Sequence, residues 1–292
     1  MRILVQKKFG GTSLSTAKAR EHVIEHISDA LKHEYKLVVV VSAMGRKGEP
    51  YATDTLLDLI ANNGNSLPAR EKDMLLGCGE TISAAVLCSQ LNSRSIPAVA
   101  FTGAQAGIFT NDSFGAAQIQ SIQPGRIEEE LERGNVVVVT GFQGITNGND
   151  LTTLGRGGSD TSATALGAAL KAEMVEIFTD VDGILTADPR IVEDAKPLSH
   201  VSFAEICNMA HSGAKVIHPR AVEIAMLANV PVRVRSTFFP KAKELGHSYR
   251  CARKRQRGDP GPFCHRDRPL CPCDAGAGDR GAGPIRPAAA SV

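Results

Sequence analysis

Residues 8–13, with the sequence KFGGTS, form a segment that could bind phosphate groups. A lysine stands at the end of an apolar stretch, and two glycines and two hydroxyl residues follow it. Glycines let the backbone approach a phosphate closely, and the start of a helix offers unpaired N–H donors. The same residues could also form only a tight turn with a helix cap. They are not a Walker A loop, because the chain has no G-x-x-x-x-G-K-[ST] pattern.

A second segment, residues 153–162 (TLGRGGSDTS), places Arg156 among three glycines. A guanidinium group can bind a carboxylate or a phosphate through two parallel hydrogen bonds. Ser159 or Asp160 could cap the helix that follows, which would be a structural role. An arginine among glycines after a buried strand is hard to justify structurally, so this segment favours a binding function.

A third segment, residues 179–190 (TDVDGILTADPR), carries three acids and an arginine. Isolated acids in loops are usually solvated turn formers. Their spacing superficially resembles a calcium-binding loop, but the segment lacks the terminal glutamate and the flanking helices of that motif. By spacing alone, Glu80 in GCGE at 77–80 would be an ordinary helix charge.

The histidines and cysteines do not predict a metal site. His211 and His218 lack the H-E-x-x-H type of spacing, and the CPC run at 271–273 has poor spacing for zinc. Cys78 and Cys88 have no nearby His–acid pattern, so we expect core thiols rather than nucleophiles.

The elements that must position these segments alternate between strand and helix patterns over the first 236 residues. Short apolar runs predict strands, and apolar residues at helical spacing predict the helices between them. The expected strands are at 3–8, 37–41, 97–101, 136–140, 175–179 and 232–236. The expected helices are at 15–33, 54–62, 70–93, 124–133, 159–170, 202–211 and 218–228. This alternation predicts an α/β fold, a three-layer αβα sandwich with a central, mostly parallel sheet.

The segments richest in glycine and polar residues all follow predicted strands. They lie at 9–13, 42–48, 141–160 and 180–190. Because open α/β sheets bind ligands beyond the carboxyl ends of their strands, this coincidence indicates a shared functional edge.

The composition is that of an ordinary globular protein, with 42% hydrophobic and 22% charged residues. The longest apolar runs are too short to cross a membrane, and the first residues lack a secretory signal. We therefore expect a cytoplasmic protein with no membrane partner. Residues 1–246 carry 24 Lys and Arg against 27 Asp and Glu, which does not favour nucleic-acid binding.

The composition changes abruptly near residue 246. Residues 247–292 contain 8 Arg but one Lys, no Glu, and many Pro, Gly and Ala. Their few apolar side chains cannot offset the entropy lost on ordering. We predict one domain at 1–246 and a disordered tail without helix or strand at 247–292. We interpret this tail as the out-of-frame translation of a gene whose true frame continued further.

Six motifs together resemble aspartokinase, of the amino-acid kinase superfamily. They are KFGGTS (8–13), VVVVSAMG (38–45), GCGE (77–80), TLGRGGSDTSA (153–163), TDVDGILTADPR (179–190) and SGAKVIHPRA (212–221). The resemblance covers about residues 1–246, which would be the catalytic domain. It implies ATP-dependent phosphorylation of the side-chain carboxylate of L-aspartate to 4-phospho-L-aspartate, the first step toward lysine, threonine and methionine.

The resemblance also implies roles for residues at matching positions. Lys8 would stabilise the transferring phosphoryl group and Asp160 would organise the catalytic cations. Residues implied to line the aspartate pocket are Ser42, Thr53, Glu80, Arg156 and Ser159. Residues implied to hold the nucleotide are Lys8, Gly10, Gly11, Thr179, Asp180, Arg190 and Lys215. Arg156 would bind a substrate carboxylate and Glu80 the amino group. ATP is then a substrate and Mg2+ the expected cofactor, with no dedicated metal site on the protein.

Two departures from the family pattern bear on function. Leu185 stands where relatives often carry an aromatic residue, so the adenine contact there would be weaker. Residues 247–292 do not resemble the family's C-terminal pair of ligand-sensing ACT modules. A homodimer would be weakened without those modules, and feedback inhibition by lysine or threonine would be absent.

The expected chemistry needs no general base. The acceptor carboxylate has a reference pKa of about 3.9 and is ionised at pH 7. Catalysis should therefore rest on in-line positioning and on neutralisation of negative charge. Two alternatives stay open, a catalytically silent nucleotide-binding remnant and a kinase for another acceptor such as glutamate, N-acetylglutamate or UMP. The long helical segment at 53–94, which contains Glu80, favours the aspartokinase branch.

Overall fold

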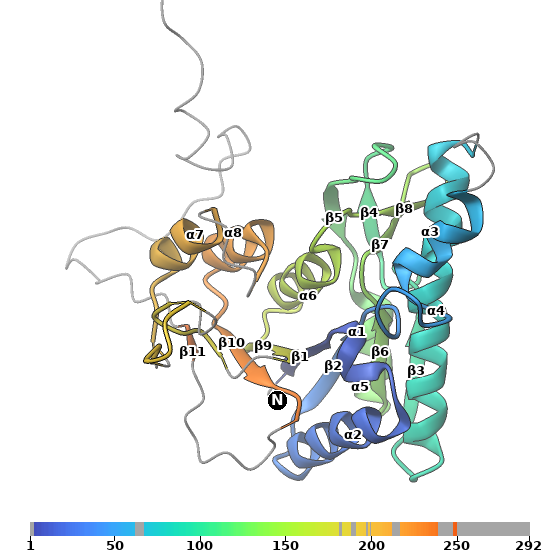
Figure 1. The fold of residues 1–292 in the computed structure, drawn as a ribbon. Helices are drawn as coiled ribbons and strands as arrows, with labels where there is room; N and C mark the ends of the chain where they lie inside the picture. The colour runs from blue at the N-terminus through green and yellow to red at the C-terminus, as the bar shows by residue number, and fades with distance from the viewer. Residues whose placement is uncertain are drawn as a thin grey trace, which may run out of the picture. The chain divides into compact units, whose positions relative to one another are not determined.

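The computed structural model describes residues 3–61, 67–180, 183–187, 191–196, 198, 200–211, 217–238 and 248–249. In these parts of the chain, helices and strands alternate largely as the sequence predicts (Figure 1). Of the predicted tail, only residues 248–249 are described, and they form a short strand, so the expectation of a tail without any strand is wrong there. The boundary at residue 246 lies outside the described residues and stays a prediction.

A seven-stranded sheet forms the middle layer, in the order β11-β10-β9-β1-β2-β6-β3. Its strands are β1 Ile3–Phe9, β2 Lys36–Val41, β3 Ala98–Phe101, β6 Val136–Thr140, β9 Val175–Thr179, β10 Val232–Ser236 and β11 Ser248–Tyr249. Each described pair in this sheet is parallel except β10 with β11. The predicted mostly parallel sheet is therefore confirmed.

Helices cover both faces of this sheet (Figure 1). One face packs against α1 Gly11–Leu14, α2 Ala17–Lys32 and α4 Ala69–Asn92. The other packs against α5 Gly125–Glu132, α6 Gly158–Ala169, α7 Phe203–His211 and α8 Pro219–Ala228. In β2, Val39 and Val41 join the first core, whereas Val38 and Val40 join the second. This alternation follows from the period of two in a strand, and it confirms the αβα sandwich.

A second, four-stranded sheet was not predicted from the sequence. Its strands, in the order β5-β4-β7-β8, are β5 Ile119–Ile122, β4 Ile108–Thr110, β7 Gln143–Ile145 and β8 Leu151–Thr153. These strands are only three or four residues long, too short to show a clear alternation. Strand β8 packs against α4, and α3 Thr53–Ala61 packs against α4 as well (Figure 1).

Helix α4 is long and apolar enough to span a membrane by length and composition alone. It packs against β3, β6 and β8, and its inward side carries the buried carboxylates of Asp73 and Glu80. These contacts are those of a core helix in a globular domain. Cys78, expected to be a core thiol, is exposed on the other side of this helix, so that prediction is wrong.

The path of the chain brings several loop segments to one edge of the large sheet. From β1 the chain passes to β2 on one side, and it later returns to β9 on the other side of β1. Phe9 is in register with both Val41 and Phe178. The residues that follow β1, β2 and β9 therefore lie next to one another, at the point where an open α/β sheet binds its ligands.

Candidate functional site

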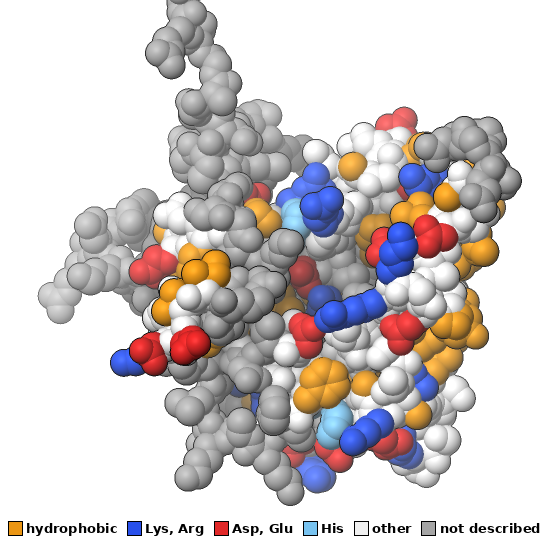
Figure 2. All heavy atoms as spheres, in the orientation of Figure 1, with side chains coloured by type: hydrophobic (Ala, Val, Ile, Leu, Met, Phe, Trp, Pro, Cys, Tyr) orange, Lys and Arg blue, Asp and Glu red, His pale blue; other side chains and the backbone are white. Residues whose placement is uncertain are grey.

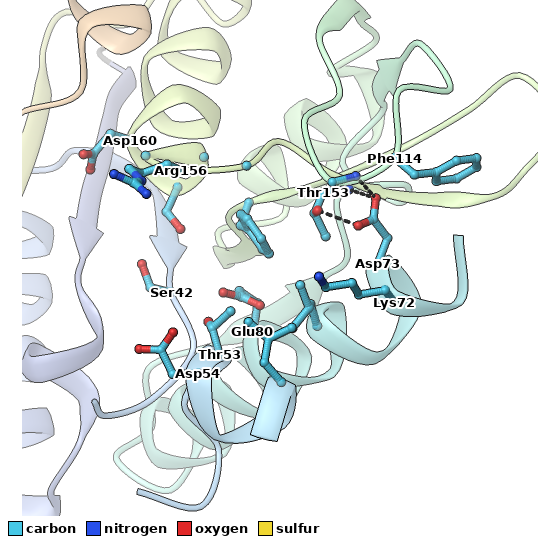
Figure 3. Close-up of a pocket in the computed structure, with 18 of the residues that line it drawn as sticks. Ser42, Thr53, Asp54, Lys72, Asp73, Glu80, Phe114, Thr153, Arg156 and Asp160 are labelled. Atoms are coloured by element: carbon cyan, nitrogen blue, oxygen red, sulfur yellow. Dashed lines mark hydrogen bonds between the residues drawn. The ribbon is translucent and has the colours of Figure 1, made fainter. Parts of the chain in front are cut away.

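A cavity of about 680 Å³ opens among the carboxyl end of the large sheet, the start of α6 and the inward side of α4. Figure 3 shows side chains from these elements around a common open space, with Arg156 and Asp160 on one side and Asp73 and Thr153 on the other. The predicted site residues that line this cavity are Lys8, Ser42, Thr53, Glu80, Arg156, Ser159 and Asp160. Segments more than a hundred positions apart are thus brought to one place.

Lys8 and Asp160 form an ion pair at this cavity. The Lys8 Nζ atom lies 2.8 Å from Asp160 Oδ1, and each side chain is 14% exposed. Asp160 lies in the first turn of α6, where the helix dipole favours negative charge. Gly157 rather than Ser159 or Asp160 occupies the N-cap position of α6, so neither side chain serves as its cap. The pair holds a cationic group within reach of anything bound in the cavity.

Glu80 brings an almost fully buried carboxylate to the cavity, 2% exposed. The Ala43 N–H donates to Glu80 Oε1 at 3.0 Å, while Oε2 has no hydrogen-bond partner among the described residues. Burial raises the pKa of Glu80 to about 8. Gly79 allows this close approach, because a Cβ there would lie 2.8 Å from the Ala43 Cβ. An unpaired buried carboxylate oxygen beside a cavity is suited to an ammonium group.

Arg156 lies between two glycines with left-handed backbones, Gly155 at φ +72° and Gly157 at φ +70°. At Gly157 an added Cβ would lie 2.2 Å from the His218 ring, so the ring occupies the space of a side chain. Burial lowers the pKa of His218, and the neighbouring Arg220 and Arg156 guanidinium groups act in the same direction. Arg156 itself has no hydrogen bond or ion pair with any described residue, and its exposed guanidinium is available to an anion.

Phe142 also lines the cavity, although no pattern in the sequence indicates it. Its φ of +68° is unusual for a residue other than glycine. The Phe142 N–H donates to Ser162 Oγ at 3.1 Å, and its carbonyl accepts from the Leu154 N–H at 2.9 Å. Such strained conformations persist where the surroundings determine them, and they gather at functional sites.

Other lining residues were missed because they look ordinary in the sequence. Asp54, Lys72, Asp73 and Phe114 all line the cavity. Lys72 and Asp73 stand in the charged run REKD, which is typical of a solvated helix face. Without the fold, nothing in that run separates the buried Asp73 from its exposed neighbours.

Of the described residues predicted to hold a nucleotide, Lys8 lines the cavity, whereas Gly10, Gly11, Thr179 and Asp180 are not among its lining residues. Gly10 follows β1 and Thr179 ends β9, two strands that are paired in register, and Asp180 forms an ion pair with Arg46. A Cβ at Gly10 would lie 3.8 Å from Lys8 Nζ, so glycine leaves the space beside this ammonium group open. At Gly11 a Cβ would lie 2.6 Å from the Gly45 carbonyl oxygen, which gives this glycine a packing role.

Two further nucleotide residues proposed from the resemblance, Arg190 and Lys215, lie outside the described residues. Their roles stay predictions. Among the residues that the structure describes, no group of three or more His, Cys, Asp or Glu side chains could hold a metal ion.

The amino-acid sequence is similar to those of known aspartokinases. It is 58% identical over 238 residues to aspartokinase 1 of Bacillus subtilis, covering 82% of this chain and 59% of that protein. It is 48% identical over 239 residues to aspartokinase of Mycolicibacterium smegmatis, covering 82% of this chain and 56% of that protein. The chain therefore spans little more than half the length of these relatives.

The fold is similar to solved aspartate kinase structures. The aspartate kinase of Synechocystis matches with a TM-score of 0.72 and 43% identity, over 84% of this chain and 39% of that one. The Escherichia coli aspartokinase III in complex with aspartate and ADP (R-state) matches with a TM-score of 0.72 and 30% identity, over 85% of this chain and 64% of that one.

The sequence also matches the model of a protein family. The match extends over residues 2–236, which include the motifs at Lys8, Glu80 and Arg156 and the strands of the large sheet up to β10. On the strength of that match, the chain belongs to the amino acid kinase family.

Proposed function

We propose that this protein is an aspartokinase, which transfers the γ-phosphoryl group of ATP to the side-chain carboxylate of L-aspartate and yields 4-phospho-L-aspartate and ADP. One observation carries the proposal. The unpaired Glu80 oxygen and the unpaired Arg156 guanidinium line the same cavity as Lys8. Glu80 in its ionised form and the Arg156 guanidinium suit the ammonium and the α-carboxylate of a free amino acid. The substrate's side chain is then left to face Lys8.

The remaining lining residues suit a small polar substrate. Ser42, Thr53 and Ser159 offer hydroxyl groups that can donate to carboxylate oxygens. Phe142 offers an apolar surface for the single methylene group of aspartate. The E. coli relative of known structure is a complex with aspartate and ADP, which supports the same pair of ligands for this chain.

The transfer step requires an anion to approach a polyanion. Lys8 lies where it can neutralise charge on the transferring phosphoryl oxygens, and Asp160 holds its ammonium group in place. An aspartate side chain is ionised at pH 7, so its oxygen can attack without a general base. The phosphorus–oxygen bond to ADP breaks as the new bond to the carboxylate oxygen forms, and the electron pair of the broken bond stays on ADP.

The nucleotide would lie on the other side of Lys8 from the amino acid. Gly10 leaves space beside the Lys8 ammonium group, Thr179 ends the neighbouring strand β9, and Asp180 follows that strand. Unpaired N–H groups at the start of a helix favour phosphate. We propose that Gly10, Gly11, Thr179 and Asp180 hold the nucleotide, with Arg190 and Lys215 as further predicted contacts.

A Mg2+ ion fits the carboxylate that lies beside Lys8, where the phosphoryl group would be transferred. Mg2+ in kinases is usually held by one or two carboxylates together with substrate phosphates, rather than by an all-protein cage. Asp160 is the carboxylate that lines the cavity beside Lys8, and it would provide the protein ligand. When bound, the ion would neutralise charge on the β- and γ-phosphate oxygens.

We further propose that the protein is cytoplasmic and forms a homodimer. Figure 2 shows hydrophobic side chains along the side of the molecule where Figure 1 places α3 and α4. In α3 the Leu59 side chain is 66% exposed, and in α4 the Met74 side chain is 59% exposed. Contact with a second copy would cover such apolar surface. Light scattering coupled to size-exclusion chromatography measures the mass, and a monomeric mass at about 100 times the concentration of the activity assay would contradict the dimer.

The central experiment measures ADP release that depends on the amino acid acceptor. Hydroxylamine traps an acyl phosphate, so it identifies the product chemically. We expect turnover with L-aspartate and far less with L-glutamate, N-acetylglutamate or UMP. Equal turnover with glutamate would contradict the aspartate assignment. ATP binding without any aspartate-dependent ADP release would instead identify a silent nucleotide-binding remnant.

A further inference from the structure

Asp73 is a buried carboxylate that lines the cavity but has no role in the chemistry described above. It is 1% exposed, and it lies on the inward side of α4. Its Oδ2 atom accepts hydrogen bonds from the N–H groups of Gly115 at 2.9 Å and Thr153 at 2.7 Å. Its Oδ1 atom accepts from the Thr153 hydroxyl at 2.8 Å. Figure 3 shows the two contacts with Thr153.

These three neutral donors offset the cost of burying the Asp73 carboxylate, which has no ion pair among the described residues. A buried charge is costly unless it is well hydrogen-bonded, and an apolar side chain of similar size would serve ordinary packing better. A carboxylate that accepts two backbone N–H groups fixes the backbone that provides them. The arrangement therefore points to a need for exact placement of two loops.

One of these loops carries Arg156, and the other contacts it. Thr153 is the last residue of β8, and only Leu154 and Gly155 separate it from Arg156. Gly115 contacts the same loop, because a Cβ at Gly155 would lie 3.0 Å from the Gly115 carbonyl oxygen. Asp73 thus holds the loop of Arg156 directly through Thr153 and indirectly through Gly115.

The same helix carries Glu80. Asp73 and Glu80 are seven positions apart, which is about two helical turns, so they project from the same side of α4. Gln143 of β7 makes a second contact with this helix. Its Nε2 atom donates to the carbonyl of Gly77, which lies between Asp73 and Glu80 in α4, at 2.5 Å. Helix α4 therefore sets where Glu80 lies, and Asp73 fixes the Arg156 loop to that helix.

We propose that Asp73 is a positioning residue that determines which amino acid the cavity accepts. This inference rests on the proposed function, in which Glu80 and Arg156 bind the ammonium and the α-carboxylate. Aspartate and glutamate share those two groups and differ by one methylene in the side chain. If Glu80 and Arg156 stay at a fixed distance from Lys8, only a side chain of one length brings its carboxylate to Lys8. If Glu80 and Arg156 could shift, the longer side chain of glutamate would fit as well.

The test compares the affinities of the protein for L-aspartate and L-glutamate by titration calorimetry in the presence of ADP. One methylene group in a well-defined pocket is worth about 10- to 200-fold in discrimination. We expect Asp73→Ala to lose most of that preference, because aspartate binds more weakly while glutamate changes little. The affinity for ADP should stay within about twofold, which is within the spread of neutral changes.

Two further variants sharpen the test. Asp73→Asn should keep most of the preference, because its amide oxygen can accept from both N–H groups and its NH2 can donate to the Thr153 hydroxyl. Thr153→Val removes a single hydrogen bond and should reduce the preference partly, even if Asp73→Ala fails to fold. Asp58→Ala is the control, since it removes an exposed carboxylate of α3 whose nearest cation, Lys47, is 3.9 Å away.

The outcomes separate this inference from the proposed function. A wild-type chain that binds neither amino acid would overturn both. A wild-type chain that prefers aspartate, with Asp73→Ala and Thr153→Val weakening both amino acids by the same factor, would overturn only the inference. In that case Asp73 would serve stability alone. A selective loss of the aspartate preference, absent in Asp58→Ala, supports the positioning role.

Discussion

The hydroxyl oxygens of Ser13 and Thr237 lie 2.6 Å apart, although 224 positions separate them in the sequence. Both residues are fully buried. The Thr237 N–H donates to the Thr179 carbonyl at 2.9 Å, and His26 Nε2 lies 3.2 Å from the Thr237 carbonyl. Thr237, directly after β10, therefore ties the turn that follows β1 to the residue that ends β9. Both of those positions belong to the proposed nucleotide site.

We predict that Thr237→Val raises KM for ATP several-fold and leaves KM for aspartate nearly unchanged. Valine has nearly the same shape but leaves the buried Ser13 hydroxyl without its partner, which should cost about 1–3 kcal/mol of unfolding free energy. Thr237→Ser should restore both properties. Steady-state kinetics and chemical unfolding measure them.

The matched control is Ser15→Ala, which removes a hydroxyl near the same turn that donates only to the Thr12 carbonyl, at 3.1 Å. The pair Ser13→Ala and Thr237→Val should be less harmful together than the sum of the single changes, because they remove one shared contact. Strictly additive effects would show that the two hydroxyls do not act through each other.

The buried Glu80 carboxylate predicts that aspartate binding depends on pH. Burial raises its pKa to about 8, so in the free protein Glu80 is mostly neutral below that pH. An ammonium group binds the ionised form, and binding at lower pH must therefore release a proton. The Kd for aspartate should rise by about tenfold per pH unit as the pH falls from about 8 to 6.

Titration calorimetry at several pH values measures this slope, and buffers with different ionisation enthalpies measure the released proton. Glu80→Gln should bind aspartate weakly at every pH and remove the slope. An unchanged slope in that variant would assign the titration to another group.

Lys8 and Arg156 should differ in their kinetic effects. Lys8 acts on charge that develops during transfer, so Lys8→Ala should lower kcat by about 100- to 1,000-fold with little change in KM for aspartate. Arg156 binds a carboxylate that does not react, so Arg156→Ala should chiefly raise KM for aspartate. If the two patterns are exchanged, the roles assigned to these residues are wrong.

The sequence predicted the large sheet well because its strands β2 and β6 carry continuous apolar runs that are buried on both faces. In β2 the run Val38–Val41 can only be a buried strand or helix, and its length decides for a strand. The short strands β4, β5, β7 and β8 give no such signal. Their arrangement depends on tertiary contacts such as the packing of β8 against α4, which no local pattern encodes.

The residues of the site likewise divide into those that a local motif indicates and those that depend on tertiary contacts. Lys8, Glu80, Arg156 and Asp160 were found through motifs, and the fold brings them to one cavity. Asp73 was missed because its partners, Gly115 and Thr153, lie 42 and 80 positions away. Residues whose function is to hold other residues depend on tertiary contacts, so their sequence surroundings look ordinary.

Gly157 offers a test of how firmly the Arg156 loop must be held. Its φ of +70° would cost about 1–2 kcal/mol with an alanine side chain. The new Cβ would also lie 2.2 Å from the His218 ring, which must then move. We expect Gly157→Ala to displace the loop and to lower kcat/KM for aspartate on the order of 100-fold, since small misplacements of binding groups have effects of that size.

The strain and the clash can be separated with two further variants. Gly134→Ala introduces alanine at φ +86°, where nothing lies within 4 Å of the added Cβ. It should lose a similar part of the unfolding free energy but keep its kcat/KM. Gly157→Ala combined with His218→Gly keeps the strain and removes the clash, because both the ring and the Cβ of His218 lie within 2.4 Å of the new Cβ, so it should recover part of the lost activity. If Gly157→Ala loses stability but no activity, the loop tolerates displacement, and Arg156 does not need the fixed position that its neighbours give it.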